Sequence, residues 1–462
     1  MSDRAATGGA DINARLIAAR IERLPFTAWQ LAVGIIIASA WFFDAVDALA
    51  IAYVLPVLNS SWKLAPFETG MLIAGGYAGQ AIGSIAAGWF AERWGRMPVM
   101  LTTLLVFSAM SLACAFAWDF GSMLAFRFVQ GIGLGGEVPI MITYINEFSK
   151  AKGRGRFALG IQVLFAVGLV ASALMGVWVV PNLGWQWMFY IGALPGLLLL
   201  PLRWMVPESA RWLASKGRYA EADRILARIE AIATRGGKTL PPLPADLPPA
   251  QPAPCRFGDL FKGIYRARTI STWCLWICCF GTSYGVGTWL PSIYRAKFGL
   301  PLQQSLTYGF IQTAATLVGT LITVFTIDAL GRRPLFVTGL LGTALPLLSF
   351  LLIPAVSAES VLIRVCIAYF FLAALVLSLG MYTAEIYPNN MRALGSGVAA
   401  AWQRSAATVG PLIVGTLLPG WGLDAVFVFF GSVAAVAFLV CVFFVIETRG
   451  RVLEQLSPQL PA

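Results

Sequence analysis

Long apolar runs recur along nearly the whole 462-residue chain, and they constrain its fold more than any other feature. Each run is long enough to cross a bilayer, which takes about 20 helical residues, and most are joined by short polar segments. Charged residues make up 12% of the sequence, whereas an ordinary soluble domain is about a quarter charged. So few charges cannot coat a soluble surface of this size. The sequence therefore predicts an all-α membrane protein.

We expect twelve membrane-spanning helices arranged as two pseudo-symmetric six-helix bundles. Their predicted ranges are 29–57, 69–91, 98–117, 122–147, 157–180, 186–206, 270–296, 303–328, 335–355, 361–386, 393–418 and 424–446. The resulting domains are an N-terminal tail at 1–28, a first bundle at 29–206, a linker at 207–269, a second bundle at 270–446 and a C-terminal tail at 447–462. The linker combines a helical stretch at 220–233 with a proline-rich run, which stays extended because proline lacks a backbone donor.

Lysine and arginine are distributed unevenly between alternate connecting segments. The segments on the side of the N-terminus hold most of them, and the opposite side holds only Lys63, Arg295, Lys297 and Arg364. Because cytoplasmic loops carry the excess of positive charge, we expect a multi-pass protein of the bacterial inner membrane with both termini in the cytoplasm. The net charge of +11 then matches contact with anionic lipid heads rather than with nucleic acid. The seven cysteines lack disulfide or zinc spacing, and we expect neither a metal nor a cofactor.

The two halves of the sequence repeat each other at a nearly constant offset. The segment AERWGRMP at 91–98 aligns with IDALGRRP at 327–334, 236 positions later. Three residues have counterparts 238 positions later, since Tyr144, Glu147 and Arg154 match Tyr382, Glu385 and Arg392. Arg127 and Arg364 differ by 237 positions. Transporters commonly contain such repeats, and the offsets indicate an internal duplication.

Four segments carry a resemblance to a known family. The run GWFAERWGRMPVM at 88–100 resembles the signature of the major facilitator superfamily after its second helix, and RFVQGIGLGGE at 127–137 resembles its fourth-helix motif. The runs PESARWL at 207–213 and YTAEIYPNNMRALG at 382–395 resemble sequences of sugar porters and metabolite:proton symporters in that superfamily. The resemblance implies the major facilitator fold and a secondary transporter, not an enzyme.

In that family, charge contacts latch the cytoplasmic ends of the helices. By position, Glu92, Gly95 and Arg96 would form this latch with Arg93 beside them, although the family usually has aspartate where Glu92 stands. The residues that we assign to gating are Glu92, Arg93, Gly95, Arg96, Arg127, Glu147, Arg154, Asp328, Arg332, Glu385 and Arg392.

Neither of two common nucleotide-binding patterns applies to this sequence. Residues 131–136 spell G-x-G-x-x-G, but the motif lies inside an apolar helix, where close packing through small residues explains it better. No G-x-x-x-x-G-K-[ST] occurs, so the chain does not bind ATP as a primary pump would. Transport must therefore draw on an ion gradient or on the gradient of the substrate itself.

A few charged residues fall near the middle of predicted spans. Each costs on the order of 2.5 to 3.5 kcal/mol at the bilayer centre and so needs a partner or a task. Asp44 and Asp47 share one face of the first helix, and Glu137 lies midway along the fourth. Close acids cannot all ionise in a low dielectric, and the sequence has no histidine, so carboxylates must carry any proton. We predict proton coupling through Asp44, Asp47 and Glu137.

Arg404 lies about 18 Å into the eleventh span and is the natural partner of an anionic substrate. A guanidinium pairs a carboxylate through two parallel hydrogen bonds; the alternative is a salt bridge to one of the acids. The D-x-x-D form at 44–47 resembles that of aromatic acid:proton symporters, with Ala45 in place of their usual glycine. Further predicted substrate contacts are polar and aromatic: Gln162, Gln312, Tyr284, Trp289, Tyr382 and Trp402.

These features predict a proton-coupled symporter, active as a monomer, that imports a small organic anion such as an aromatic or pyridine carboxylate by alternating access. Three alternatives stay open. PESARWL favours a sugar or polyol porter, and the acidic first helix favours an exporter of cationic drugs. The third is a sensor on a carrier fold, which would bind its ligand without flux.

Overall fold

The computed structural model describes residues 15–17, 19–25, 27–148, 154–234, 239–243 and 255–450, and within these ranges the regular elements are helices without strands. The first half contains α2 (Ala28–Trp62), α3 (Pro66–Trp94), α4 (Arg96–Ala115), α5 (Phe120–Phe148), α6 (Arg154–Leu183), α7 (Gln186–Gly192), the 3-10 helix η1 (Leu194–Leu198) and α8 (Leu199–Met205). The connecting segment contains α9 (Ala210–Ser215), α10 (Tyr219–Ala233) and η2 (Phe257–Phe261). The second half contains α11 (Tyr265–Gly287), α12 (Leu290–Phe298), α13 (Leu302–Leu330), α14 (Arg332–Leu348), η3 (Ser349–Leu351), α15 (Ala358–Glu385) and α16 (Asn389–Phe444).

The described helices account for twelve membrane-length segments. Eight helical stretches are long and apolar enough to span a membrane, with α7 to α8 counted as one of them. The last stretch, α16, bends at Gly422, where φ is +80°, and so supplies two spans. The glycine-rich helices α3 and α5 and the broken pair α11–α12 supply the others. The predicted fold class is confirmed.

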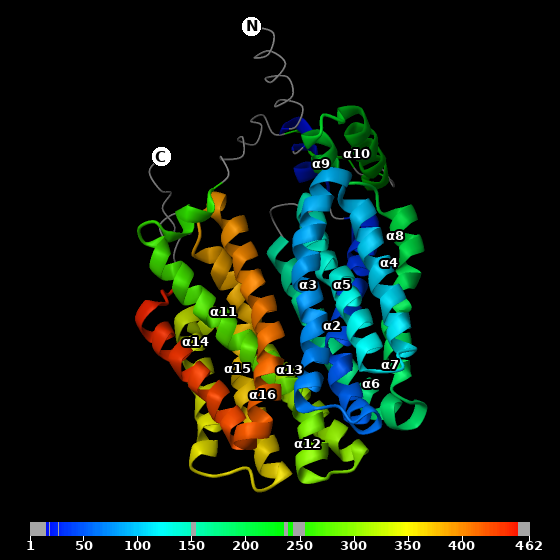
Figure 1. Ribbon diagram of the computed structural model, residues 1–462. Helices are drawn as coiled ribbons and strands as arrows, with labels where there is room; N and C mark the ends of the chain where they lie inside the picture. Colours follow the sequence, from blue (N-terminus) through cyan, green and yellow to red (C-terminus); the bar gives the residue numbers. More distant parts are fainter. Residues whose placement is uncertain are drawn as a thin grey trace.

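The helices form two groups that stand side by side (Figure 1). Helices α2 to α8 make one group and α11 to α16 the other, with α9 and α10 above the end of the first group. We call the end that carries α9 and α10 the inner end and the opposite end the outer end. Helix α12 lies at the outer end between the groups, where it contacts α2.

The two halves meet closely in their outer parts. A side chain at Gly70 of α3 would lie 2.9 Å from the carbonyl oxygen of Pro411, and one at Gly415 of α16 would lie 2.8 Å from that of Pro66. The amide of Asn59 in α2 donates to the hydroxyl of Ser292 in α12 at 3.5 Å. In this conformation the outer ends of the halves are therefore packed together.

Glycines also set the packing inside the first half. A Cβ atom at Gly131 of α5 would lie 2.1 Å from the carbonyl oxygen of Gly76 in α3, and one at Gly135 would lie 2.1 Å from that of Gln80. Such approaches exclude any side chain, because real Cβ contacts are far longer. The G-x-G-x-x-G run thus joins two membrane helices, as predicted.

The second bundle begins earlier than the predicted residue 270. Helix α11 starts at Tyr265, so Arg266 and Arg268 lie at its inner end and not in a loop. The guanidinium of Arg268 donates to the carbonyl oxygen of Ile386 at 3.2 Å. In the connecting segment, the predicted helix at 220–233 matches α10, and most of the proline-rich run, 244–254, falls outside the described residues, as do 451–462 of the predicted C-terminal tail.

The start of the chain docks onto the connecting segment. Residues 15–17 and 19–23 are helical, and Ile17 and Ile21 pack into a cluster with Trp212, Leu213 and other residues of α9 and α10. Glu230 of α10 accepts from Arg20 at 2.8 Å and from Arg23 at 2.6 Å. Burial opposes the ionisation of Glu230, but these hydrogen bonds outweigh it and hold its pKa below the usual value.

Replacing Glu230 by glutamine should release this docked segment. A carboxyl whose pKa is lowered on folding stabilises the folded form above its ordinary value of about 4.3, and that stabilisation is lost as the pH falls further. We therefore expect trypsin to cut faster at Arg20 and Arg23 in Glu230→Gln at neutral pH. Glu221→Gln is the control, because among the described residues Glu221 pairs with the exposed Arg218 and not with Arg20 or Arg23. Equal cutting of the two variants would show that the ion pairs do not hold the segment.

Candidate functional site

An ion-pair cluster joins the inner ends of α3, α4 and α5. Arg96 contacts Glu92 at 2.8 Å and Glu147 at 3.0 Å. The backbone N–H groups of Arg96 and Met97, which open α4, donate to the carboxylate of Glu208 at 3.0 and 3.2 Å. An anion at a helix N-terminus satisfies free N–H groups and matches the positive end of the helix dipole. Burial raises the pKa of Glu208, although hydrogen bonds from Ser209, Arg96 and Met97 oppose that shift.

The second half repeats this cluster with its own residues. Arg332 contacts Asp328 and Glu385, each at 2.9 Å. The N–H groups of Arg332 and Arg333 donate to Glu447, both at 3.0 Å, in the way that α4 is capped by Glu208. Burial opposes the ionisation of Glu447, but four backbone N–H groups outweigh it and hold its pKa below the usual value.

Both clusters depend on a glycine in an unusual backbone conformation. Gly95 has a φ of +108° and Gly331 a φ of +95°, which strain any other residue. A Cβ atom at these positions would lie 2.3 Å from Glu208 Oε2 and 2.6 Å from Glu447 Oε2. Glycine therefore permits the chain reversal and also leaves room for the capping carboxylate.

The remaining predicted gating residues take different positions. The guanidinium of Arg93 lies over the ring of Trp89, 5.5 Å from its centroid, outside the cluster. Arg392 lies in the first turn of α16, and its Nε has no hydrogen-bond partner among the described residues. The side chain of Arg154 lies outside the described residues.

Tyr382, predicted as a substrate contact, packs near the inner end of the second half. It is 1% exposed, lies edge-on to Phe336, and accepts a hydrogen bond from the backbone N–H of Ile446 at 3.2 Å. Its counterpart Tyr144 donates to the carbonyl oxygen of Pro207 at 2.7 Å. Both tyrosines thus fasten the chain that leaves the last helix of their own half.

A buried polar group lies in the outer part of the first half. Asp47 of α2 pairs with Arg127 of α5 at 2.9 Å and accepts from the amide of Gln130 at 2.8 Å. Arg127 also donates to the amide oxygen of Gln130 at 2.9 Å. All three are 1–3% exposed. Arg127, predicted to act in gating, is therefore a partner of a predicted proton-coupling acid.

Breaking this pair from one side should destabilise the protein strongly. Removing one member of a buried ion pair typically costs about 3 to 5 kcal/mol, because the other charge stays buried without compensation. We expect Asp47→Asn and Arg127→Gln each to lower the thermal unfolding midpoint in detergent. The midpoint of the double variant should fall by less than the sum of the two single decreases. A decrease equal to that sum would contradict the pairing.

Glu137 of α5 is a buried carboxyl without a partner. It is 2% exposed, and neither of its oxygens has a hydrogen-bond partner among the described residues. Asp44 of α2 is the charged group close enough to interact with it. Leaving an ionised carboxylate in such a place costs several kcal/mol, so the neutral acid fits this position.

Asp44 of the first half and Arg404 of the second lie near each other at the boundary between the halves. Both are half-buried, and their charges interact, although within the described residues neither has an ion pair within 4 Å. Arg404 of α16 donates instead to the amide oxygen of Gln80 in α3. The alternative prediction for Arg404, a salt bridge to an acid, has no counterpart among the described residues in this conformation.

Aromatic rings surround this meeting point. Tyr77 of α3 and Tyr284 of α11 lie with their centroids 4.7 Å apart, and both interact electrostatically with Arg404. Tyr284 continues into a row along α11, stacked on Phe280 at 6.1 Å, which stacks on Trp276 at 5.1 Å. We call Asp44, Gln80, Tyr77, Tyr284 and Arg404 the central group.

The other predicted substrate contacts either have partners outside the central group or have side chains outside the described residues. Trp289 is 3% exposed and donates to the carbonyl oxygen of Pro411 at 3.2 Å, which fixes α12 to α16. Gln312 is buried and donates to Thr316 at 3.1 Å. Trp402 packs on Trp273, with centroids 5.5 Å apart. The side chain of Gln162 lies outside the described residues.

Comparison with known proteins decides the family. Residues 45–460 match the family model described as "Sugar (and other) transporter". The chain belongs to this family of the major facilitator superfamily. It is 33% identical over 442 residues to the niacin transporter NiaP of Acinetobacter baylyi, covering 96% of this chain and 99% of that one. It is 31% identical to the putative niacin/nicotinamide transporter NiaP of Bacillus subtilis, covering 82% of this chain and 86% of that one.

Solved structures agree on the fold. A structure of the xylose transporter XylE from E. coli, in a partially occluded inward-open conformation, superimposes with a TM-score of 0.72 at 20% identity, covering 92% of this chain and all of that one. At this identity the likeness shows the fold alone. As a member of the sugar (and other) transporter family, the protein is a multi-pass secondary transporter and not an enzyme.

The sequence interpretation missed several residues of this transporter that the structure brings into its site. Gln130 and Glu208 lie inside two of the family-like motifs, but the motifs alone predict no role for either residue. Glu447 could have been found from the repeat, since it follows Glu208 by 239 positions. Gln80 and Tyr77 carry no such signal, because they lie among small residues of α3 whose neighbours come from the other half.

Proposed function

We propose that the protein imports a small organic anion together with a proton, and that Arg404 binds the carboxylate. The observation that carries this proposal is the position of Arg404 at the boundary of the halves. Unlike Arg127, it has no carboxylate within 4 Å among the described residues. A half-buried guanidinium that lacks a counter-ion favours a ligand with a carboxylate. The carboxylate can pair with the guanidinium through two parallel hydrogen bonds.

The aromatic rings favour a flat substrate. Tyr77 and Tyr284 lie close enough to Arg404 to interact with its charge, and an aromatic or pyridine carboxylate such as nicotinate would contact both the rings and the charge. One similar protein is named as a niacin transporter, which supports the same choice, and another is named as a putative niacin/nicotinamide transporter.

Glu137 is the acid that we propose to carry the proton. Its oxygens are buried without hydrogen bonds when the outer ends are packed together, so a proton on Glu137 would permit this closed arrangement. Loss of the proton would leave a buried charge and would favour an arrangement in which water reaches α5. Asp44 faces both Glu137 and Arg404 and would respond to substrate and proton together.

The two inner clusters fit a latch for alternating access. Each is built within its own half, around Arg96 and Arg332, and would keep the inner helix ends rigid while the halves rock. In the orientation expected from the positive charges, the inner end faces the cytoplasm together with both termini.

A sugar substrate is the second candidate, favoured by the family description. A sugar has no charge to pair with Arg404, and hydroxyl-rich ligands would call for more amide and hydroxyl groups than the central group offers. An exported cation would be repelled by Arg404. A sensor without flux differs from all of these by binding alone.

Ligand-dependent stabilisation of the purified protein tests the substrate class. A ligand that binds only the folded state raises the unfolding midpoint. At a ligand concentration of 100 times Kd, it adds about 2.7 kcal/mol to the free energy of unfolding. We expect nicotinate and benzoate to raise the midpoint, and nicotinamide, which lacks the carboxylate, to have little effect. Stabilisation by xylose or nicotinamide but not by nicotinate would overturn the anion assignment.

A further inference from the structure

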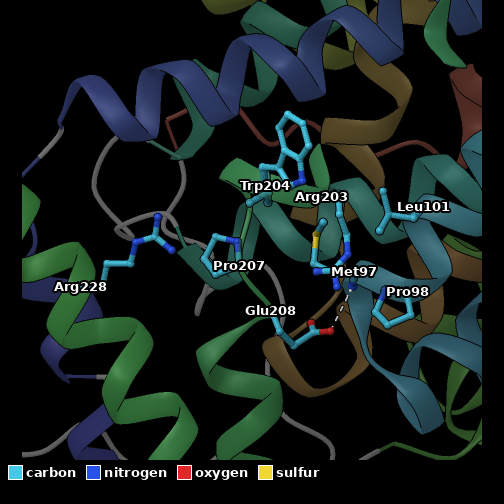
Figure 2. A pocket seen from close by; sticks show the side chains of 9 residues that line it. Met97, Pro98, Leu101, Arg203, Trp204, Pro207, Glu208 and Arg228 are labelled. Carbon is cyan, nitrogen blue, oxygen red and sulfur yellow. Dashed lines mark hydrogen bonds between the residues drawn. The ribbon is translucent and has the colours of Figure 1, made fainter. Parts of the chain in front are cut away.

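A pocket of about 330 Å³ opens at the inner end of the first half (Figure 2). Met97 and Leu101 of α4 form one wall, and Arg203 and Trp204 at the end of α8 form another. Arg228 reaches it from α10, beyond Pro207 (Figure 2). The pocket lies apart from the central group, and the transport mechanism makes no use of it.

The charges around this pocket are unbalanced. Within the described residues, Arg203 and Arg228 have no carboxylate within 4 Å, and both are exposed. The one acid in the lining, Glu208, already accepts from the backbone N–H groups of Arg96, Met97 and Ser209. Two free guanidinium groups beside a satisfied carboxylate make a site for an anion with several acceptor oxygens, such as a phosphate ester.

The surroundings indicate that this anion belongs to a lipid. Trp204 is 73% exposed, as is typical of tryptophan where a membrane protein meets the headgroups. One and two turns back along the chain, Leu200 is 59% and Leu197 is 71% exposed, and Leu105 on α4 is 53% exposed. These leucines continue from the pocket along the face that lies in the bilayer and offer a surface for acyl chains.

We propose that the pocket binds the phosphodiester headgroup of an anionic phospholipid of the cytoplasmic leaflet, held between Arg203 and Arg228. The bound lipid joins α8 to α10 and so fastens the cytoplasmic helices against the bundle. It also lies beside Glu208, the cap of α4, and thereby next to the inner cluster around Arg96. An anionic lipid molecule is then a bound structural ligand of this transporter, in addition to the lipids of the surrounding bilayer.

Lipid binding to the purified protein tests this site by native mass spectrometry and by the unfolding midpoint, with phosphatidylglycerol compared with phosphatidylcholine. Each basic residue near an anionic surface contributes about 1 kcal/mol, so Arg203→Gln/Arg228→Gln should bind phosphatidylglycerol about thirtyfold more weakly than wild type. Arg224→Gln is the matched control, because Arg224 is an exposed arginine one turn earlier on α10 and does not line the pocket.

The proposal predicts that phosphatidylglycerol stabilises the wild type and the control but not the double variant. Arg203→Lys/Arg228→Lys keeps the charges and should retain part of the effect. Equal stabilisation of all variants, or no preference over phosphatidylcholine, would overturn the site. Full competition by glycerol 3-phosphate would assign the pocket to a soluble phosphate ester and would overturn the lipid assignment.

Discussion

Replacing Arg404 by glutamine is expected to abolish uptake of nicotinate at low substrate concentrations. Glutamine keeps a hydrogen-bonding group near Gln80 but removes the charge that the carboxylate would meet. Hydrogen bonds to a charged group contribute about 1.5 to 3 kcal/mol each, so the loss should weaken binding by about tenfold to a hundredfold or more. Uptake of the radiolabelled anion into proteoliposomes measures the effect.

Two further variants separate the charge of Arg404 from the structure of its helix. Arg404→Lys should retain weak uptake, because an ammonium keeps the charge but not the two parallel hydrogen bonds. Ser405→Ala changes an exposed neighbour on α16 and should leave uptake unchanged. Undiminished uptake by Arg404→Gln, or equal loss in Ser405→Ala, would contradict the binding role.

Replacing Glu137 by glutamine should uncouple transport from protons without abolishing exchange of substrate. Glutamine resembles the neutral acid in shape and remains uncharged, so the buried position of α5 is preserved. An inward gradient of about one pH unit supplies about 1.4 kcal/mol per proton and drives about tenfold accumulation in a coupled carrier. We expect the variant to lose this accumulation and to keep counterflow of labelled for unlabelled nicotinate.

The counterflow measurement makes the Glu137 prediction specific. A variant that fails to fold would lose both activities, whereas an uncoupled variant loses only accumulation. Glu137→Asp should recover part of the coupling, since it restores a titratable carboxyl. Accumulation by Glu137→Gln at the wild-type level would exclude Glu137 as the proton carrier and would direct attention to Asp44, which faces it.

Most of the fold could be predicted from the sequence because bilayer thickness sets the length of each apolar run. The repeat of Glu92, Gly95 and Arg96 at Asp328, Gly331 and Arg332 predicted the paired halves, and the structure builds matching clusters there. The exact ends of helices were less predictable. Arg268 looked like part of a linker but caps the neighbouring chain from inside α11.

The repeat did not predict which pairs of corresponding residues make the same contacts in both halves. Arg127 is buried against Asp47, whereas its counterpart Arg364 lies over the ring of Phe350 and donates to Ile353 O in an outer loop. Alignment shows which residues correspond, but the partners depend on side chains elsewhere that diverged independently. The central group was only partly predicted for a similar reason, because Gln80 meets Arg404 across the boundary between the halves.

Proton movement during uptake distinguishes proton-coupled import of an anion from uncoupled uptake. Proteoliposomes with a trapped pH-sensitive dye should acidify inside when nicotinate is added outside, at a rate above that of protein-free liposomes, which corrects for diffusion of the free acid. We predict that Arg404→Gln and Glu137→Gln both lose this protein-dependent acidification and that xylose never produces it. Uptake of nicotinate by the wild type without protein-dependent acidification, or acidification driven by xylose, would contradict proton-coupled anion import.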